Sequence, residues 1–284
     1  MEYSLQSLVA QAEEAGLAEA AIAGEIKHNG LTREGIIARM DEALQVMRQS
    51  AQRGFDPKLH SMSRMTGGQA AKLQSAVAAG QTVGGDYLGR AAARALAIAE
   101  CNAAMGKIVA APTAGACGIL PAALLTAQEA YQLSDEALRN GLIVAAAIGE
   151  VIAARASISG AQGGCQAECG SAAAMAAAAL VYLRGGSPQQ SADACAFALM
   201  NVMGLVCDPV GGLVEVPCVY RNASGVAGAF VAADLALAGI PSPIPPDEVI
   251  DAMKAVGEHL PPALRETGEG GCAACPSVCR HRKT

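Results

Sequence analysis

Three cysteines in the sequence stand in segments whose glycines and prolines disfavour a regular helix or strand. Cys165 follows the glycines of GAQGGCQAECG, Cys207 lies in GLVCDPVGG, and Cys218 lies in VEVPCVYRN. An iron–sulfur cluster needs thiolates that converge on it and backbone N–H groups that are free to donate to its sulfurs. Irregular segments supply both, but the spacing of these thiols matches no compact ferredoxin pattern. From the residues alone, a three-cysteine cluster site and simple packing both stay open.

The other cysteines before the C-terminal tail favour packing over chemistry. Cys101 and Cys195 lie in apolar helical runs, where a thiol behaves as a small buried hydrophobic group. Cys117 follows PTAG in an irregular segment, and packing is favoured there over a ligand role. Cys169 comes one helical turn after Cys165, so it can either face the same site or pack.

The C-terminal tail CAACPSVCRHRKT offers a second arrangement of possible metal ligands. Cys272, Cys275 and Cys279 together with His281 give the spacing C-x2-C-x3-C-x-H, which suits zinc or a cluster. A single short tract without a second CxxC is a weak signal, and the alternative is a tail that binds nothing.

Composition indicates a protein of closely packed helices. The chain has 284 residues and is 52% hydrophobic, but it has no Trp and only 3 Phe and 5 Tyr, so its apolar content is mostly aliphatic. A net charge of −6 offers no basic field for nucleic acid or an anionic membrane. Glu150 and Arg155 interrupt an apolar run, and the N-terminus lacks a signal-peptide pattern, so we expect a cytoplasmic protein without a membrane span. In that reducing compartment, the 10 cysteines are expected to be free thiols or metal ligands.

Helices separated by glycine-rich segments must position the candidate thiols. Ser134 is expected to cap one helix, and Ser187, with Pro188 and Gln190 after it, is expected to cap another that ends near Gly204. Residues 204–225 are predicted to be irregular throughout, and loops of that length are uncommon in compact domains unless they are functional.

These patterns predict an all-α fold, a compact helical domain with glycine-rich loops, and the family resemblance carried by the motifs below implies that these loops converge on a metal-cluster site. We expect one domain over residues 1–284. It comprises N-terminal helices (1–55), a core (56–271) to which the same resemblance assigns catalysis and cluster binding, and a Cys-rich tail (272–284).

Five motifs, in order along the chain, give the sequence a specific resemblance. SRMTGGQA, AAPTAGACGILPA, GAQGGCQAECGSAAAMAA, GLVCDPVGGLVEVPCVYRN and TGEGG resemble the α subunit, or α domain, of the iron–sulfur-dependent L-serine dehydratases. The resemblance implies that Cys165, Cys207 and Cys218 hold a 4Fe–4S cluster. It also implies that Gln166 and Glu168 lie around the cluster without binding it, and it makes packing the favoured role of Cys169.

The resemblance implies how the reaction proceeds and what is missing from this chain. Three thiolates leave one iron of the cluster open to act as a Lewis acid on the hydroxyl of L-serine, while a base removes the α-proton. His60 is a weak candidate for that base. The histidine motifs of the family's β portion are not present here, so the resemblance implies a separate L-serine dehydratase β subunit that carries the base.

Polar residues in the same motifs are candidates for holding the small amino-acid substrate. Each is individually a weak signal, because Ser and Thr beside Gly occur in any turn. Arg64 is a candidate partner of the substrate carboxylate. The candidate substrate-binding residues are Ser61, Ser63, Thr66, Thr113 and Asn222.

Two alternative functions stay open beside the serine dehydratase. One is a related iron–sulfur lyase of the L-cysteine desulfidase type, and the other is a cluster-based redox sensor. The second is disfavoured because electron carriers normally cover all four irons of a cluster. Whether Cys272, Cys275 or Cys279 caps the open iron is left open by the sequence.

Overall fold

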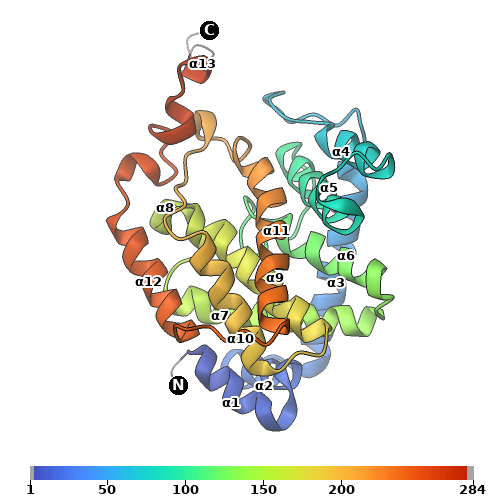
Figure 1. Ribbon diagram of the computed structural model, residues 1–284, viewed down its shortest axis with the longest axis vertical. Helices are drawn as coiled ribbons and strands as arrows, with labels where there is room; N and C mark the ends of the chain where they lie inside the picture. The colour runs from blue at the N-terminus through green and yellow to red at the C-terminus, as the bar shows by residue number, and fades with distance from the viewer. Residues whose placement is uncertain (1–2, 280–284) are drawn as a thin grey trace.

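The computed structural model describes residues 3–279, and this part of the chain folds into helices with no β-strand (Figure 1). The all-α prediction is therefore confirmed. The helices are α1 (Leu5–Ala15), α2 (Leu17–Asn29), α3 (Arg33–Gly54), α4 (Gln69–Ala78), α5 (Gly85–Ala103), α6 (Ile119–Tyr131), α7 (Asp135–Arg155), α8 (Gly160–Gly163), α9 (Ser171–Leu183), α10 (Pro188–Asn201), α11 (Cys218–Leu237), α12 (Pro246–His259) and α13 (Pro276–Cys279). A π-helical turn (Gln166–Gly170) and 3₁₀ turns (Val210–Gly212, Pro262–Leu264, Gly271–Ala274) lie between them.

Helix α9 forms the centre of the molecule, and α6, α7, α10 and α11 pack around it (Figure 1). Its first eleven residues, 171–181, are all buried, and most of them are alanines. Small side chains allow neighbouring helices to approach α9 closely on every side. A helix that is apolar all round is stable only when neighbours bury it in this way. The alanine-rich run that the sequence shows is thus the axis of the fold.

Helix starts that depend on local hydrogen bonds were predicted correctly. Ser134 Oγ accepts from the backbone N–H of Ala137 at the start of α7. Ser187 and Gln190 form the expected capping box at the start of α10, with Pro188 at its first position. The N-terminal run is divided into α1 and α2 at Gly16, whose φ of +83° is unfavourable for any other residue.

The predicted irregular segment 204–225 is wrong in its second half. Helix α11 begins at Cys218 and includes the stretch CVYRNASG. Val219 and Asn222 are buried in its first turns, because α11 packs along α5 and α9. Helix formation here follows from burial of one face against those neighbours, which local sequence preferences do not reveal.

Helix α7 is long and apolar enough to cross a membrane by length and composition, and it is the one such helix among residues 3–279. In this structure, 56% of its most apolar window is buried inside the protein. That burial is what a core helix of a folded domain shows.

One end of the molecule collects the segments that carry the candidate motifs. The segment before α4, the start of α11 and the C-terminal segment lie at the upper end in Figure 1, and α1 and α2 lie at the opposite end. The start of α11 at Cys218 therefore lies at the same end of the molecule as the C-terminal segment and the segment before α4, although these come from distant parts of the sequence.

Candidate metal centre

The structure brings the three predicted ligand cysteines together in one buried site. Cys165, Cys207 and Cys218 are 1%, 3% and 5% exposed. Each thiol lies within electrostatic range of the other two. Their ligand role stays a prediction, and the structure places these three thiols, from three separate segments, in one buried region.

The backbone before Cys165 can be made only by glycine. Gly164 has a φ of +77°, and a Cβ atom there would lie 2.6 Å from Leu260 Cδ1 and 2.8 Å from the carbonyl oxygen of Leu205. The backbone N–H of Gln166 donates to that same carbonyl oxygen over 2.9 Å. The chain therefore turns tightly against the 202–206 segment and delivers Cys165 to the mouth of the π-helical turn before α9. Such turns frequently occur at functional sites.

Gln166 is a structural clamp, which refines the role that the resemblance implied for it. Its side-chain nitrogen donates to the carbonyl oxygen of Met253 over 3.0 Å, and its side-chain oxygen accepts from the N–H of Gly204 over 2.8 Å. The side chain is fully buried. It therefore holds α12 and the segment leading to Cys207 against the Cys165 turn.

Cys207 is fixed by the C-terminal segment, which runs beside it as a short parallel bridge. The N–H of Cys207 donates to the carbonyl oxygen of Leu264, and the N–H of Glu266 donates to the carbonyl oxygen of Cys207. On its other side stands Gly160, where a Cβ atom would lie 2.9 Å from the Cys207 sulfur. Because the TGEGG motif follows Glu266 directly, this motif supports the thiol site.

Cys218 is the first residue of α11, and Asn222 one turn later fixes that helix to the PTAGACG loop. Asn222 donates to the carbonyl oxygens of Gly115 and Cys218 and accepts from the N–H of Gly118, all over 2.7–2.8 Å. Its amide is completely buried. Asn222 was predicted to bind substrate, and the structure shows all three of its hydrogen bonds made within the protein.

Charged side chains surround the thiols. Arg221 forms an ion pair with Asp208 over 2.8 Å and lies beside Cys165. A hydrogen bond with Cys169, and then the Arg221 charge, lower the pKa of the Cys165 thiol against the effect of burial. Burial raises the pKa of Cys218 to about 12 and raises that of Cys207 as well.

Two carboxylates also face this cluster of thiols. Glu168 accepts a hydrogen bond from Thr113 Oγ1 over 2.5 Å, and burial raises its pKa. Glu266 approaches from the C-terminal segment, with its Oε2 3.3 Å from the Cβ position of Gly160. The sequence analysis missed Glu266, although a charged residue beside TGEGG was a usable signal. Thr113, a predicted substrate ligand, is here the partner of Glu168.

This donor set fits an iron–sulfur cluster better than a single hard cation. Three thiols are soft ligands, whereas Mg²⁺ and Ca²⁺ prefer oxygen ligands. Among residues 3–279, no three Cys, His, Asp or Glu side chains converge closely enough to bind one metal ion. A cluster is larger than an ion, so its ligands stand further apart, and the wider convergence of these buried thiols is compatible with it.

The remaining hydroxyl candidates gather on a different carboxylate, that of Glu215. Ser63 Oγ donates to one of its oxygens over 2.5 Å, and the N–H and Oγ1 of Thr66 donate to the other over 2.8 and 2.7 Å. Ser61 belongs to the same group, because its hydroxyl forms hydrogen bonds with Ser63 Oγ and with the carboxylate of Glu215. Substrate binding by these residues stays a prediction, and their visible role is to fasten the 56–68 segment to the segment before Cys218.

His60 and Arg64 lie on the same segment and are exposed. The imidazole of His60 stands against Gly67, where a Cβ atom would lie 2.7 Å from its Nδ1. Arg64 has a φ of +62° and points away from the core. Among residues 3–279, no observed hydrogen bond connects the side chain of either residue to the thiols.

The tail approaches the thiol site through one of its cysteines. The N–H of Cys272 donates to Asp208 over 2.6 Å, and its thiol also interacts with that carboxylate. Cys275 is exposed. His281 lies outside the described residues, as does the side chain of Cys279, so the four-residue tail site stays a prediction.

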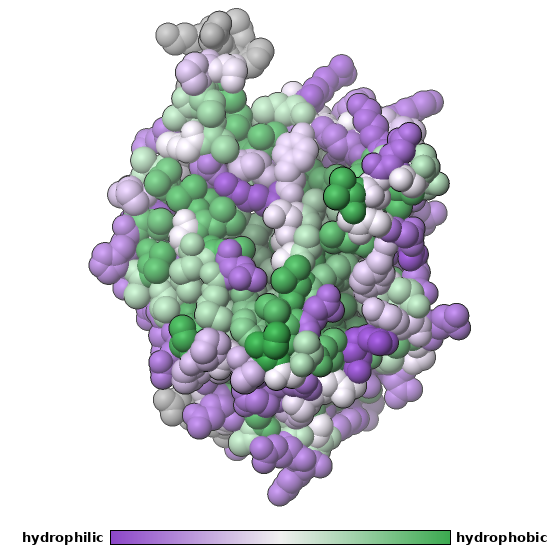
Figure 2. Space-filling model, in the orientation of Figure 1, coloured by the Kyte–Doolittle hydropathy of each residue, from purple (hydrophilic) through white to green (hydrophobic). Residues whose placement is uncertain are grey.

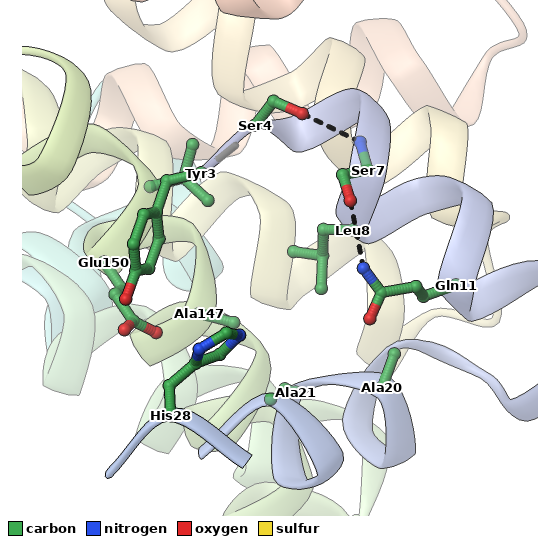
Figure 3. A pocket seen from close by; sticks show the side chains of 12 residues that line it. Tyr3, Ser4, Ser7, Leu8, Gln11, Ala20, Ala21, His28, Ala147 and Glu150 are labelled. Carbon is green, nitrogen blue, oxygen red and sulfur yellow. Dashed lines mark hydrogen bonds between the residues drawn. The ribbon is translucent and has the colours of Figure 1, made fainter. Parts of the chain in front are cut away.

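A separate small cavity of about 70 Å³ lies between α1, α2 and α7, at the end of the molecule away from the thiols (Figure 3). Tyr3, His28 and Glu150 stand on one side of it and Leu8 on another. No cysteine lines it, so it is not part of the candidate metal centre.

The similarity of this chain to known proteins agrees with the site. A family model described as serine dehydratase alpha chain matches residues 5–273. The chain belongs to this family. The match includes Cys165, Cys207 and Cys218 and the carboxylate of Glu215, and it ends before Cys275 of the tail.

Two relatives are similar to this chain over most of their length, and a third is a longer protein that matches over part of its length. The probable L-serine dehydratase alpha chain of Bacillus subtilis is 50% identical over 261 residues, which are 92% of this chain and 87% of that protein. The L-serine dehydratase alpha chain of Peptoniphilus asaccharolyticus is 48% identical over 249 residues, 88% of this chain and 85% of that one. L-serine dehydratase TdcG of Escherichia coli is 43% identical over 181 residues, which are 63% of this chain but 40% of that longer protein.

Proposed function

We propose that this chain is the α subunit of an L-serine dehydratase that converts L-serine to pyruvate and ammonia with a 4Fe–4S cluster. The convergence of Cys165, Cys207 and Cys218 at one buried site, in a member of this family, is the observation that carries the proposal. The relatives named above act on L-serine by name, which favours serine over the cysteine-specific alternative.

In this proposal, the three thiols lose their protons and hold the cluster as thiolates. The cluster, when bound, supplies a Lewis acid for the serine hydroxyl. Arg221 places a positive charge beside Cys165 and is itself held by Asp208, so it offsets part of the negative charge of the thiolates. Burial of the thiols keeps water away from the metal.

The substrate loses its α-proton to a base and its hydroxyl as water. The resulting aminoacrylate takes up water and releases ammonia to give pyruvate. In this chain Glu168 and Thr113 line the site, but no histidine is fixed beside the thiols among residues 3–279. We therefore assign the base to the β subunit, which the α-chain names of the relatives imply.

Iron content after anaerobic preparation tests the ligand assignment. Cys165→Ala, Cys207→Ala and Cys218→Ala should each lose bound iron and the broad visible absorption of the cluster. Cys195→Ala is the matched control, since this thiol is equally buried in α10 but far from the site. It should keep its iron and lose only about 1 kcal/mol of stability. If all three variants retain their iron, the assignment of Cys165, Cys207 and Cys218 as cluster ligands is wrong.

Activity with and without a partner tests the assignment of the base. The isolated chain, loaded with iron, should show little or no serine dehydratase activity, and addition of an L-serine dehydratase β chain should restore it. Full turnover by the isolated chain would place the base on this polypeptide. His60→Gln would then show whether His60 supplies it.

A further inference from the structure

Four large apolar side chains are exposed next to the thiol site. Met62 is 81% exposed, Met65 39%, Leu213 48% and Tyr220 46%. We refer to them as the apolar rim. Single exposed apolar residues are ordinary on protein surfaces, whereas a group of them marks a surface that binds something.

Observed hydrogen bonds place the rim residues on one surface although they come from three segments. Ser63 and Thr66, which flank the two methionines, donate to Glu215. The N–H of Glu215 donates to the carbonyl oxygen of Leu213 over 2.7 Å. Gln69, at the start of α4, donates to the hydroxyl of Tyr220 over 3.3 Å.

The rim borders the candidate metal centre directly. Tyr220 follows Cys218 by two residues in the first turn of α11. The carbonyl oxygen of Glu215 accepts from the N–H of Val219, so the segment that carries Leu213 continues into the same turn. A protein seated on the rim would therefore stand beside the thiols.

Two buried carboxylates make the rim a pre-organised surface. Glu215 holds the segment with the methionines, and Glu100 holds the N–H groups of Gln69 and Ala70 at the start of α4, over 2.9 and 3.3 Å. Surfaces that keep their backbone shape on binding lose less entropy on association. The methionine side chains themselves are flexible and adapt to a partner surface.

Arg64 adds a charge to this surface. It lies between Met62 and Met65 and holds a φ of +62°, which is uncommon for a residue other than glycine. Its side chain is exposed, and it makes no ion pair within residues 3–279. A partner that fits the rim thus carries an apolar patch with a carboxylate opposite Arg64.

We propose that the apolar rim is the docking surface for the β chain, and that docking there brings the missing base to the thiol site. The inference rests on the proposed function. The α-chain names imply a second chain, and the matched residues make up only 40% of the longer Escherichia coli relative, so that relative has a further part outside the matched region. The rim is apolar, preformed and adjacent to the site that lacks a base.

A second apolar surface lies on α11, and it provides the control. A cavity of about 690 Å³ between α5, α9 and α11 is lined by Tyr87, Phe230 and Val231, and Figure 2 shows apolar atoms gathered over this part of α11. Val231 is 54% exposed. It stands thirteen residues beyond Cys218, about 20 Å along the helix, so a base docked there would not reach the thiols.

Binding of a purified L-serine dehydratase β chain to the full-length, iron-loaded protein tests the inference. The double variant Met62→Asp/Leu213→Asp should weaken binding, measured by isothermal titration calorimetry, at least tenfold. Its iron content and its thermal unfolding should match the wild type, because both side chains are exposed at the surface. Val231→Asp should bind the β chain with wild-type affinity.

The outcomes separate this inference from the proposed function. Unchanged binding of the double variant, or weakened binding of Val231→Asp alone, overturns the rim as the docking surface. A wild-type protein that binds no iron and turns over no serine with the β chain refutes the proposed function instead. Arg64→Lys keeps the positive charge and should bind the β chain as the wild type does, whereas Arg64→Glu reverses the charge and should bind more weakly; equal binding by both variants would refute the predicted carboxylate opposite Arg64.

Discussion

Replacement of Glu215 by Gln tests how the 56–68 segment is held. Glu215 is 4% exposed and accepts three hydrogen bonds from Ser63 and Thr66. Bonds to a charged acceptor contribute roughly 1.5–3 kcal/mol each, against roughly 0.5–1.5 for a neutral one. The Gln side chain has about the same size as Glu and keeps one oxygen that can accept hydrogen bonds. Because Ser63 is exposed, its hydrogen bond to Glu215 contributes less than the two from Thr66. We expect Glu215→Gln to lower the free energy of unfolding by about 2 kcal/mol at pH 7.

The pH dependence of this effect has a defined sign. Burial alone would raise the pKa of Glu215, but hydrogen bonds from Ser61, Ser63 and Thr66 outweigh it and hold the pKa below its ordinary value. A lowered folded-state pKa contributes stability above the unfolded pKa of about 4.3, and this contribution is lost as pH falls through the folded pKa. The difference between wild type and Glu215→Gln should therefore be constant from pH 7 to about 5 and shrink in more acidic solution.

Urea unfolding at several pH values measures the global effect, and hydrogen exchange of the Thr66 amide measures the local one. Exchange at Thr66 should accelerate in Glu215→Gln, because its N–H loses a charged acceptor. Glu13→Gln is the control, as Glu13 is an exposed residue of α1 at the other end of the molecule. Equal stability and equal Thr66 protection in wild type and variant would refute the anchoring role of this carboxylate.

Three further changes follow from the same geometry. Asn222→Ala should lower the free energy of unfolding by about 3 kcal/mol in urea titrations, because it leaves buried backbone groups of the PTAGACG loop and α11 unpaired. Gly164→Ala should destabilise by about 2 kcal/mol and reduce bound iron, since its φ of +77° and the nearby Leu205 carbonyl exclude a side chain. Replacement of Cys272, Cys275 and Cys279 together by Ser should leave bound iron intact, and complete loss of iron would make the tail the metal site.

The fold could be predicted where local chemistry determines it. The caps at Ser134 and Ser187 depend on hydrogen bonds within a few residues, so the sequence alone indicates them. The start of α11 could not be predicted this way. Pro217 and the NASG stretch look irregular, while the helix is stabilised by contacts with α5 and α9 that are remote in sequence.

The candidate ligands are conspicuous in the sequence because cysteines in glycine-rich segments are distinctive, and their role as ligands stays a prediction. Cys165, Cys207 and Cys218 are all buried in one region, although the first two stand 42 positions apart in the sequence. The arrangement of Arg221, Asp208 and the Glu266 segment around them depends on tertiary contacts between α11 and the C-terminal region. No local pattern encodes such contacts.

The predicted substrate ligands show why polar motif residues are hard to interpret from sequence. A hydroxyl or amide that can bind an amino acid can equally bind a backbone group or a carboxylate of the protein. Asn222 binds the PTAGACG loop, Thr113 binds Glu168, and Thr66 binds Glu215. These bonds fix the irregular segments, which have no helix or strand hydrogen bonds of their own, in one conformation around the thiols. Surrounding hydrogen bonds orient the ligands of a metal site, and in the proposed cluster site the polar motif residues would supply that support.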